Sequence, residues 1–422
     1  MTQTSKKRIK ITLISFIILF IAFISFTLFE TKDDINATFS TIDQNLQELQ
    51  RTDRNAGFSV AVFTKDSVLF KKGYGFSDIK NETLYTDITK QYIASISKTT
   101  IGVSLVKAQE LGLLHIDDDV NDYLPFKISN PNFLDEKITL KQLATHTSSL
   151  DYNENVVESL YISEDKKKKS LKEFIHNYFE KGVYGEITYM ENKPGTVFNY
   201  SNIGAGLAAY IIEVTSKMSY AEFSQKYIFD PLELKDTSWF LTPKDTIDIA
   251  TYYELEDEKL KEVQTDGVIL YPARDLITNI NDLTTYCQAI MSNSPKLLNE
   301  ESYATLLHPQ LDSTTKNDAI DNSGLFWMID RNQYGVTYQL TGMNGGDNTI
   351  STKMWYDPKT ELGYIFIGNM GVTKQNRINH IWLFKTLVSL GDHYMMTNPK
   401  NSFWDKVSYK SHNIYSRVRA IF

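Results

Sequence analysis

Cysteine is almost absent from this chain of 422 residues, in which Cys287 is the only one. A single thiol cannot form an intramolecular disulfide, and it cannot assemble a cysteine-based zinc or iron–sulfur site. Cys287 lies in a segment with an amphipathic helical pattern, which predicts a buried, unreactive thiol. The seven histidines lack the His-Glu-x-x-His spacing of a zinc hydrolase. We therefore expect no metal site.

Outside the N-terminus, acidic residues outnumber basic ones. The formal net charge is −8, and residues 1–10 contain four basic side chains and no acidic one, which leaves −12 on the rest of the chain. Such an acidic body repels polyphosphate, so we expect no nucleic-acid partner. With 42% hydrophobic and 23% charged residues the composition is globular. The length allows one large domain or two intergrown subdomains.

Charge is missing altogether from residues 11–29, which are dominated by Ile, Leu and Phe. As a helix this segment would be roughly 28 Å long, close to the hydrocarbon thickness of a bilayer. The basic residues 1–10 precede it, and Glu30 and Asp33 follow it. The distribution predicts a single-pass membrane anchor with a cytoplasmic N-terminus, and it places the rest of the chain in the periplasm or outside the cell.

A cleaved signal peptide is the alternative interpretation of residues 11–29. Its apolar region would be unusually long, and the sequence near Phe26–Phe29 contains no convincing small-x-small cleavage site. These two features favour an uncleaved anchor. Residues 30–50 are polar with a weak helical pattern, and we interpret them as a stalk that leads into the domain.

The remaining sequence predicts strands at both ends of the domain and helices between them. Alternating apolar residues indicate strands, including a hairpin with a turn at Asp66-Ser67, and apolar residues at helical spacing indicate helices. The expected strands cover residues 58–62, 68–70, 336–340, 350–356 and 364–367, and the expected helices begin near residues 101, 207 and 377. This order predicts an α+β fold whose sheet is built from both chain ends.

The first candidate catalytic motif is Ser95-Ile96-Ser97-Lys98, at the start of the helix expected near residue 101. Positions i and i+3 share a helix face, so the Lys98 amine can reach the Ser95 hydroxyl. A serine is a weak nucleophile until a base takes its proton, and a desolvated lysine can act as that base. The helix N-terminus adds partial positive charge where an oxyanion develops.

The second motif is Tyr200-Ser201-Asn202, which ends a loop and leads into the helix expected near residue 207. The motif places a phenol and a carboxamide side by side. A tyrosine close to cations can ionise below its usual pKa and act as a base. An asparagine at this place can hold both a substrate amide and the lysine.

Together these motifs resemble those of the serine β-lactamase and penicillin-binding-protein superfamily, which includes class C β-lactamases, D-alanyl-D-alanine peptidases and related esterases. The resemblance extends over residues 51–391. It includes the segments Gly112–Asp118, Gly324–Trp327 and Tyr356–Pro358. The segment Ile138–Leu150 is similar to a family segment that has glycine at the position of Ser149.

The resemblance implies a β-lactamase/transpeptidase-like α+β fold, in which helices flank the sheet and a helical subdomain is inserted. It implies acyl-enzyme formation on Ser95 with proton transfer by Lys98 and Tyr200, without metal or organic cofactor. Asn202 would bind substrate, and the backbone N–H groups of Ser95 and Gly346 would form the oxyanion hole. By the same resemblance, His146 is structural rather than a general base.

One position departs from the family. The third motif of the superfamily is Lys-Thr-Gly or His-x-Gly, and the matching stretch here is Thr341–Asp347, with Met343 at the basic position. Gly345 and Gly346 keep the strand slim enough for a substrate backbone to approach. A thioether carries no charge and accepts hydrogen bonds only weakly, so it cannot attract a substrate carboxylate. Substrates without a carboxylate are therefore favoured.

The sequence thus predicts a membrane-anchored serine hydrolase that acts on a small-molecule or cell-wall-type ester, amide or peptidoglycan substrate. A non-catalytic envelope protein that keeps the fold for binding is the alternative. Two regions carry further charge. Lys166–Lys169 is interpreted as a solvated helix face, and the basic and aromatic extension 392–422 either packs on the domain or lies on the membrane surface.

Overall fold

The computed structural model describes most of the chain beyond the N-terminal segment. The described residues are 32–52, 55–151, 161–162, 170–183, 188–241, 248–257, 259–264, 267–331, 339–373, 376–397, 401–402 and 405–406.

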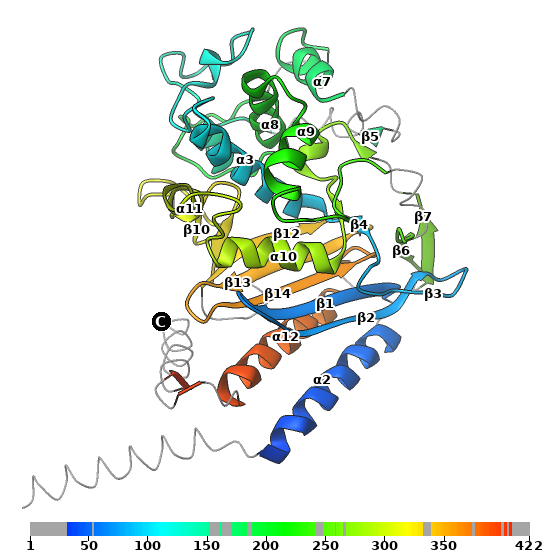
Figure 1. The fold of residues 1–422 in the computed structure, drawn as a ribbon. Helices are drawn as coiled ribbons and strands as arrows, with labels where there is room; N and C mark the ends of the chain where they lie inside the picture. Colours follow the sequence, from blue (N-terminus) through cyan, green and yellow to red (C-terminus); the bar gives the residue numbers. More distant parts are fainter. Residues whose placement is uncertain are drawn as a thin grey trace, which may run out of the picture.

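An antiparallel sheet of eight strands forms the centre of the fold (Figure 1). Strands β1 (Gly57–Thr64) and β14 (Leu362–Gly368) pair in its middle and so join the two ends of the domain. This confirms the α+β fold and the expected hairpin. From one edge to the other, the sheet contains β10 (Asn322–Ser323), β11 (Met328–Asp330), β12 (Leu340–Gly346), β13 (Ser351–Asp357), β14, β1, β2 (Val68–Asp78) and β3 (Thr83–Leu84).

The two faces of the sheet bury two different cores because successive strand residues point to opposite sides. On β1, Ala61 and Phe63 belong to the larger core, which also contains residues of most of the helices. Val60 and Val62 belong to a smaller core on the other face. Strands β1, β13 and β14 are buried almost throughout, as expected for strands covered on both faces.

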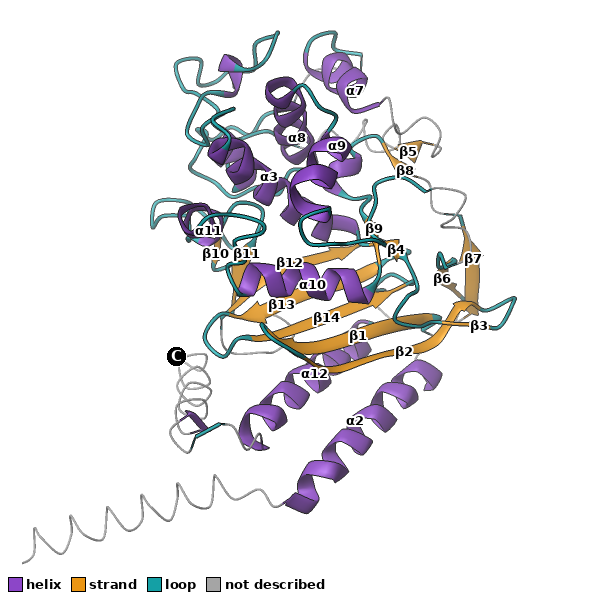
Figure 2. Cartoon of the chain, viewed as in Figure 1, coloured by secondary structure: helices purple, strands orange, loops and turns teal. Residues whose placement is uncertain are grey.

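Helices α3 (Lys98–Glu110), α8 (Asn202–Ser216) and α10 (Ile280–Met291) lie on the large-core side. Figure 2 shows α10 along the sheet, with α3 and α8 beyond it. The helices expected near residues 101 and 207 are thereby confirmed. The smaller elements of this side are η2 (Val120–Asp122), α4 (Leu140–Ala144), α7 (Ser170–Phe179), α9 (Tyr220–Ser224), η4 (Gln225–Phe229), η6 (Tyr271–Ala273) and α11 (Glu300–Leu307). Three two-stranded sheets add β4 (Gln91–Tyr92) with β9 (Ile277–Thr278), β5 (Tyr161–Ile162) with β8 (Gly267–Val268), and β6 (Tyr252–Glu256) with β7 (Lys259–Val263).

Two long helices, α2 (Lys32–Thr52) and α12 (Arg377–Thr397), lie together on the opposite face of the sheet (Figure 1). The interpretation of residues 30–50 as a stalk is corrected here, because Ile42 and Leu46 of α2 are buried in the smaller core. The boundary expected at residue 391 is also too early. Helix α12 continues past it to Thr397, and Met396 is buried in the same core.

Several sequence predictions fall on residues outside this description. They concern the anchor at residues 11–29, the basic run Lys166–Lys169, most of the strand expected at residues 336–340 and most of the extension 392–422. In the described parts of the chain, helices that combine the length and apolarity needed to span a bilayer are not found. The prediction for Cys287 is confirmed: it lies in α10 and is fully buried, and burial raises the pKa of its thiol well above the usual value.

Candidate active site

Ser95 lies in a single 3-10 turn, η1 (Ala94–Ser97), that continues directly into α3. Ala94 precedes it with a left-handed backbone, φ +48°. This conformation is strained for alanine, and such strain is often found at active sites. Ser95 itself is only partly buried, whereas Ile96 and Ser97 are buried. The turn therefore presents the Ser95 hydroxyl toward the surface.

Lys98 follows one helical turn later and is completely buried. Its Nζ lies 3.0 Å from Ser95 Oγ and donates a second hydrogen bond of 2.7 Å to the Ala273 carbonyl oxygen. Burial lowers the pKa of the Lys98 amine well below its usual value, and the positive charge of Arg274 lowers it further. A neutral amine with one N–H bound to Ala273 has a lone pair available for the serine proton.

Tyr200 ends the loop before α8, and its ring lies beside the lysine. Lys98 Nζ is 5.0 Å from the centroid of the Tyr200 ring. The next residue, Ser201, caps α8 by accepting a hydrogen bond of 3.0 Å from the backbone N–H of Gly204. Asn202 is the first residue of α8 and is half-buried. The structure thus brings Ser95, Lys98 and Tyr200 together.

His146 contacts two residues of the same loop, Tyr200 and Ser201. Its Nδ1 accepts a hydrogen bond of 3.1 Å from the backbone N–H of Ser201, and its ring lies 4.4 Å from that of Tyr200. The Phe326 ring packs edge-on against the imidazole, with the two ring centroids 5.2 Å apart. Burial, together with the nearby charge of Lys98, lowers the pKa of His146 to about 3. His146 is therefore a neutral hydrogen-bond acceptor, which agrees with the structural role expected of it.

Ser149 follows in the same segment and has a left-handed backbone, φ +62°. Glycine adopts this conformation without steric cost, whereas other residues are strained. The similar family segment has glycine at this position. The backbone geometry is therefore retained although the residue differs.

Strand β12 forms the opposite wall of the site. A side-chain carbon at Gly345 would lie 2.2 Å from the Ile93 carbonyl oxygen and 3.1 Å from the Ser95 backbone nitrogen. Only glycine permits this approach. Gly346 comes next at the exposed end of the strand. The two backbone groups expected to form an oxyanion hole thus belong to segments in direct contact.

Met343 lies on the same face of β12 as Gly345, two residues earlier. Its side chain is 1% exposed and belongs to the large hydrophobic core. It packs in the interior below the site, opposite Met354 of β13. Met343 was expected to face the substrate at the basic position of the motif. That expectation is corrected here, because the thioether is buried in the core instead of lining the open site.

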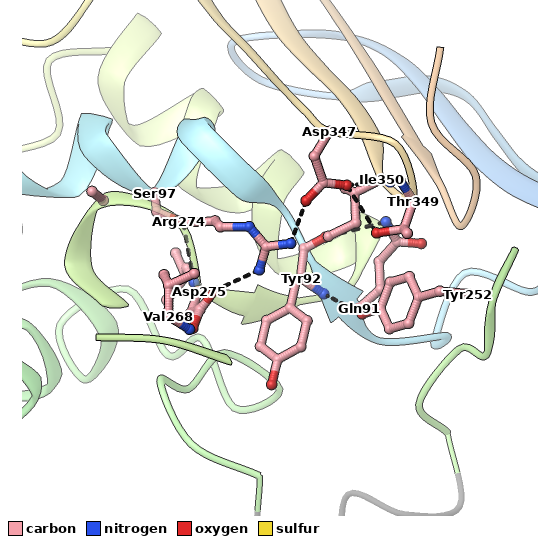
Figure 3. Close-up of polar contacts among 12 residues, drawn as sticks. Gln91, Tyr92, Ser97, Tyr252, Val268, Arg274, Asp275, Asp347, Thr349 and Ile350 are labelled. Carbon is pink, nitrogen blue, oxygen red and sulfur yellow. Dashed lines mark hydrogen bonds and ion pairs between the residues drawn. The ribbon is translucent and has the colours of Figure 1, made fainter. Parts of the chain in front are cut away.

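Two features of the site were not predicted from the sequence, the Ala273 carbonyl and the Arg274 side chain. A backbone carbonyl has no sequence signature. Arg274 did leave a signal, because Arg274 and Asp275 are the only charged residues between Gly267 and Ile280. In Figure 3 the guanidinium of Arg274 points between Asp275 and Asp347.

Comparison with known proteins agrees with this geometry. The family described as Beta-lactamase matches residues 42–383. The chain therefore belongs to the beta-lactamase family, within the superfamily of serine β-lactamases and penicillin-binding proteins. It is 25% identical over 337 residues to Protein flp of Staphylococcus aureus (strain N315), which covers 79% of this chain and 64% of that protein. The chain thus spans less than two thirds of that relative's length.

Two solved structures share the fold. One is the octameric penicillin-binding protein homologue from Pyrococcus abyssi, with a TM-score of 0.68, 21% identity and coverage of 84% of this chain and 77% of that chain. The other is EstCE1, a hydrolase with promiscuous acyltransferase activity, with a TM-score of 0.69, 14% identity and coverage of 84% and 100%. At these identities the likeness concerns the fold alone.

Proposed function

We propose that this protein is a membrane-anchored serine hydrolase that forms an acyl-enzyme on Ser95, with an ester, amide or peptidoglycan-type substrate. The proposal depends chiefly on one observation: the buried Lys98 amine, whose pKa is lowered, lies 3.0 Å from the Ser95 hydroxyl. The beta-lactamase family supports a serine hydrolase in general terms. The substrate class is inferred from Met343, and the anchor from residues 11–29.

In the acylation step, Lys98 takes the proton of Ser95 as Oγ bonds to the substrate carbonyl carbon. The ester or amide bond then breaks, and the leaving group receives a proton from Lys98 through the neighbouring Tyr200 phenol. In the second step water attacks the acyl carbon and gives a proton to the same pair of side chains. The bond between that carbon and Ser95 Oγ breaks, Oγ takes the proton back, and the acid is released. Neither step involves oxidation or reduction.

Charge on the substrate oxygen develops beside the Ser95 turn and the end of β12. The backbone N–H groups of Ser95 and Gly346 are the proposed donors to it. The close approach of Gly345 to the Ser95 backbone supports this assignment. Loss of one such donor typically lowers turnover by roughly 100- to 1,000-fold.

The proposed substrates lack a carboxylate near the scissile bond. Met343 supplies no positive charge at the position that is basic in Lys-Thr-Gly and His-x-Gly motifs, and it is buried. An uncompensated carboxylate beside this wall would lose its hydration without gaining an ion pair. Esters and uncharged amides avoid this cost.

Covalent labelling tests the proposal. We expect a fluorophosphonate probe to label the full chain on Ser95 and the label to vanish in Ser95→Ala. Lys98→Met should slow labelling by about 100-fold or more, because general-base catalysis is lost. Ser389→Ala, on the exposed side of α12, is the matched control and should react as the wild type does. A folded wild-type protein that is not labelled and does not hydrolyse p-nitrophenyl esters would contradict the proposal.

That negative outcome would favour the second candidate, a non-catalytic envelope protein that binds its ligand in the same site. The apolar Met343 in place of a basic residue is the observation that favours it. The anchor is tested separately. We expect washed membranes to contain a single species of full-chain mass, whereas a shortened soluble form would show that residues 11–29 are a cleaved signal peptide.

A further inference from the structure

Arg274 occupies an unusual place for an arginine. Its side chain is 14% exposed and lies between two carboxyl groups, those of Asp275 and Asp347, which are 0% and 25% exposed (Figure 3). Arg274 Nη1 is 2.9 Å from Asp275 Oδ1, and Nη2 contacts Asp347 Oδ2. A buried arginine that binds two carboxyl groups fixes the relative positions of the segments that bear them.

Each carboxyl group uses its other oxygen to hold backbone. Asp275 Oδ2 accepts a hydrogen bond of 2.6 Å from the backbone N–H of Val268. Asp347 Oδ1 accepts hydrogen bonds from the backbone N–H groups of Thr349 and Ile350, at 2.8 and 3.0 Å, and so closes the turn between β12 and β13. The Arg274 side chain therefore joins two segments that are each held firmly.

The two segments carry different parts of the proposed catalytic site. Ala273, directly before Arg274, accepts the hydrogen bond of the Lys98 amine at 2.7 Å. Gly346, directly before Asp347, bears the proposed oxyanion donor at the end of β12. The ion pair between Arg274 and Asp347 thus spans from the lysine side of the site to its oxyanion side.

The segment after Arg274 also contacts the nucleophile turn. The backbone N–H of Leu276 donates to Ser97 Oγ at 3.1 Å, and the Leu276 carbonyl accepts from the backbone N–H of Ile93 at 3.0 Å. These bonds hold η6 against the Ser95 turn independently of Arg274. Arg274 adds a link between the η6 segment and the end of β12, which fixes the distance between them.

We propose that Arg274 is a positioning residue of this site, which clamps the η6 segment to the β12–β13 turn and so holds the Lys98 amine and the Gly346 N–H at a fixed separation around Ser95. The catalytic consequence rests on the proposed function. The geometric consequence does not depend on the proposed function: the clamp sets the distance between the η6 segment and the β12–β13 turn.

The charge of Arg274 gives the role a distinct signature. Besides the Ala273 carbonyl, Lys98 interacts with the Ser95 hydroxyl, the Tyr200 ring, the imidazole of His146 and the guanidinium of Arg274. His146 is neutral above pH 3, and Arg274 carries a permanent positive charge. Removal of that charge raises the pKa of Lys98. The acid limb of the acylation rate then moves to higher pH, because the protonated amine cannot act as base.

Three variants separate position from charge. Arg274→Gln removes the positive charge and the contacts with both carboxyl groups. Arg274→Lys keeps the charge but cannot contact Asp275 and Asp347 at once. Asp347→Asn keeps an oxygen that can accept the hydrogen bonds of the β12–β13 turn but loses the ion pair. Arg331→Gln is the matched control, because Arg331 pairs with Asp321 near the end of β11 that lies opposite Leu340, at the far end of β12 from Gly346.

The measurement is the second-order rate of fluorophosphonate labelling of the full chain between pH 5 and 10. We expect Arg274→Gln to be slower by about 10- to 100-fold, the range that a small misplacement costs, with its acid limb moved to higher pH. Arg274→Lys should recover the wild-type limb and part of the rate. Asp347→Asn should be slow without an upward shift of the limb, and Arg331→Gln should match the wild type.

Labelling of Arg274→Gln within twofold of the wild type would overturn the positioning role. So would an equal loss at every pH in Arg274→Gln, with a lower melting temperature but an unmoved acid limb. If the wild type itself is not labelled, the proposed function fails, and crystal structures of the wild type and Arg274→Gln test the clamp alone. The 2.7 Å contact between Lys98 Nζ and the Ala273 oxygen should lengthen and the β12–β13 turn should shift. Unchanged geometry would reject the clamp.

Discussion

The imidazole of His146 lies against the phenol ring of Tyr200, with ring centroids 4.4 Å apart and ring planes inclined by 33°. His146 also accepts the backbone N–H of Ser201, the residue that caps α8. One neutral side chain thereby orients both the phenol and the helix start that presents Asn202. Proximity alone would suggest a general base, but the lowered pKa assigns the histidine a supporting role.

This relationship predicts the behaviour of His146→Ala. We expect a loss of about 10- to 100-fold in the labelling rate, because Tyr200 loses the surface that orients it. The wild-type rate should show no limb near pH 6.5 from His146, whose pKa of about 3 keeps it neutral across the working range. His115→Ala, at a side chain that is 57% exposed, is the control. A histidine limb between pH 6 and 7 that disappears in His146→Ala would refute the supporting role.

A second prediction concerns the two adjacent glycines at the end of β12. In Gly345→Ala the new carbon would lie 2.2 Å from the Ile93 carbonyl oxygen, so β12 must move away from the Ser95 turn. We expect a lower melting temperature and a labelling rate reduced by about 100-fold or more. Gly346→Ala meets only the Ile350 carbonyl oxygen at 2.9 Å and should lose much less stability. Equal effects of the two substitutions on both measurements would contradict the close approach.

Met343→His tests the origin of substrate preference. An imidazole beside Gly345 restores a basic group at the position that is basic in His-x-Gly motifs. We expect the ratio of kcat/KM for a carboxylate-bearing ester to that for its neutral analogue to rise by about tenfold, on the order of one new ion contact. Because Met343 is 1% exposed, the variant should also be less stable. Met354→His, opposite it on β13, controls for the stability loss alone. An unchanged ratio would show that Met343 does not set the preference.

A fourth prediction concerns Lys353, which is buried on the other face of the sheet. Its Nζ lies 3.1 Å from Ser351 Oγ and 5.1 Å from the Phe366 ring centroid. Burial lowers the pKa of this lysine to about 7. In the unfolded chain the pKa returns to near 10.5, so the unfolded state binds more protons between these two values. Stability should therefore rise as the pH increases from about 7 to about 10.

Lys353→Met removes the buried amine while keeping a chain of similar length. We expect a higher melting temperature at pH 7 and a flatter dependence between pH 7 and 10, because each pKa unit corresponds to about 1.4 kcal/mol. Lys261→Met, at a side chain that is 63% exposed, should leave the melting temperature and its pH dependence nearly unchanged. A variant that is less stable than the wild type and keeps the same pH slope would show that Lys353 is not the cause.

Local patterns in the sequence were sufficient for much of the site. The spacing of Ser95 and Lys98 on one helical face predicted their contact, because three residues make about one turn. The Tyr200 loop was assigned because Tyr200-Ser201-Asn202 resembles the second motif of the superfamily. The strand signals at both chain ends predicted a sheet built from both ends, and the pairing of β1 with β14 confirms it.

Other features depend on contacts between distant residues, which leave little or no local pattern. Helix α2 has only a weak apolar stripe, so the sequence did not predict that it packs on the sheet. Its buried residues belong to the smaller core, which also contains residues of the paired strands β1 and β14. The depth at which Met343 is buried depends on which helices cover its face of β12.

By itself, the sequence determined which groups could react: a serine, an amine one turn away, a phenol, and a strand without a basic side chain. The tertiary structure alone decided what surrounds them. The pKa of Lys98 is lowered because burial and Arg274 act on it, and Arg274 reaches Asp347 only because 72 intervening residues fold between them. Electrostatic fields and desolvation depend on distances in space, and sequence spacing encodes such distances only within a helix or a strand.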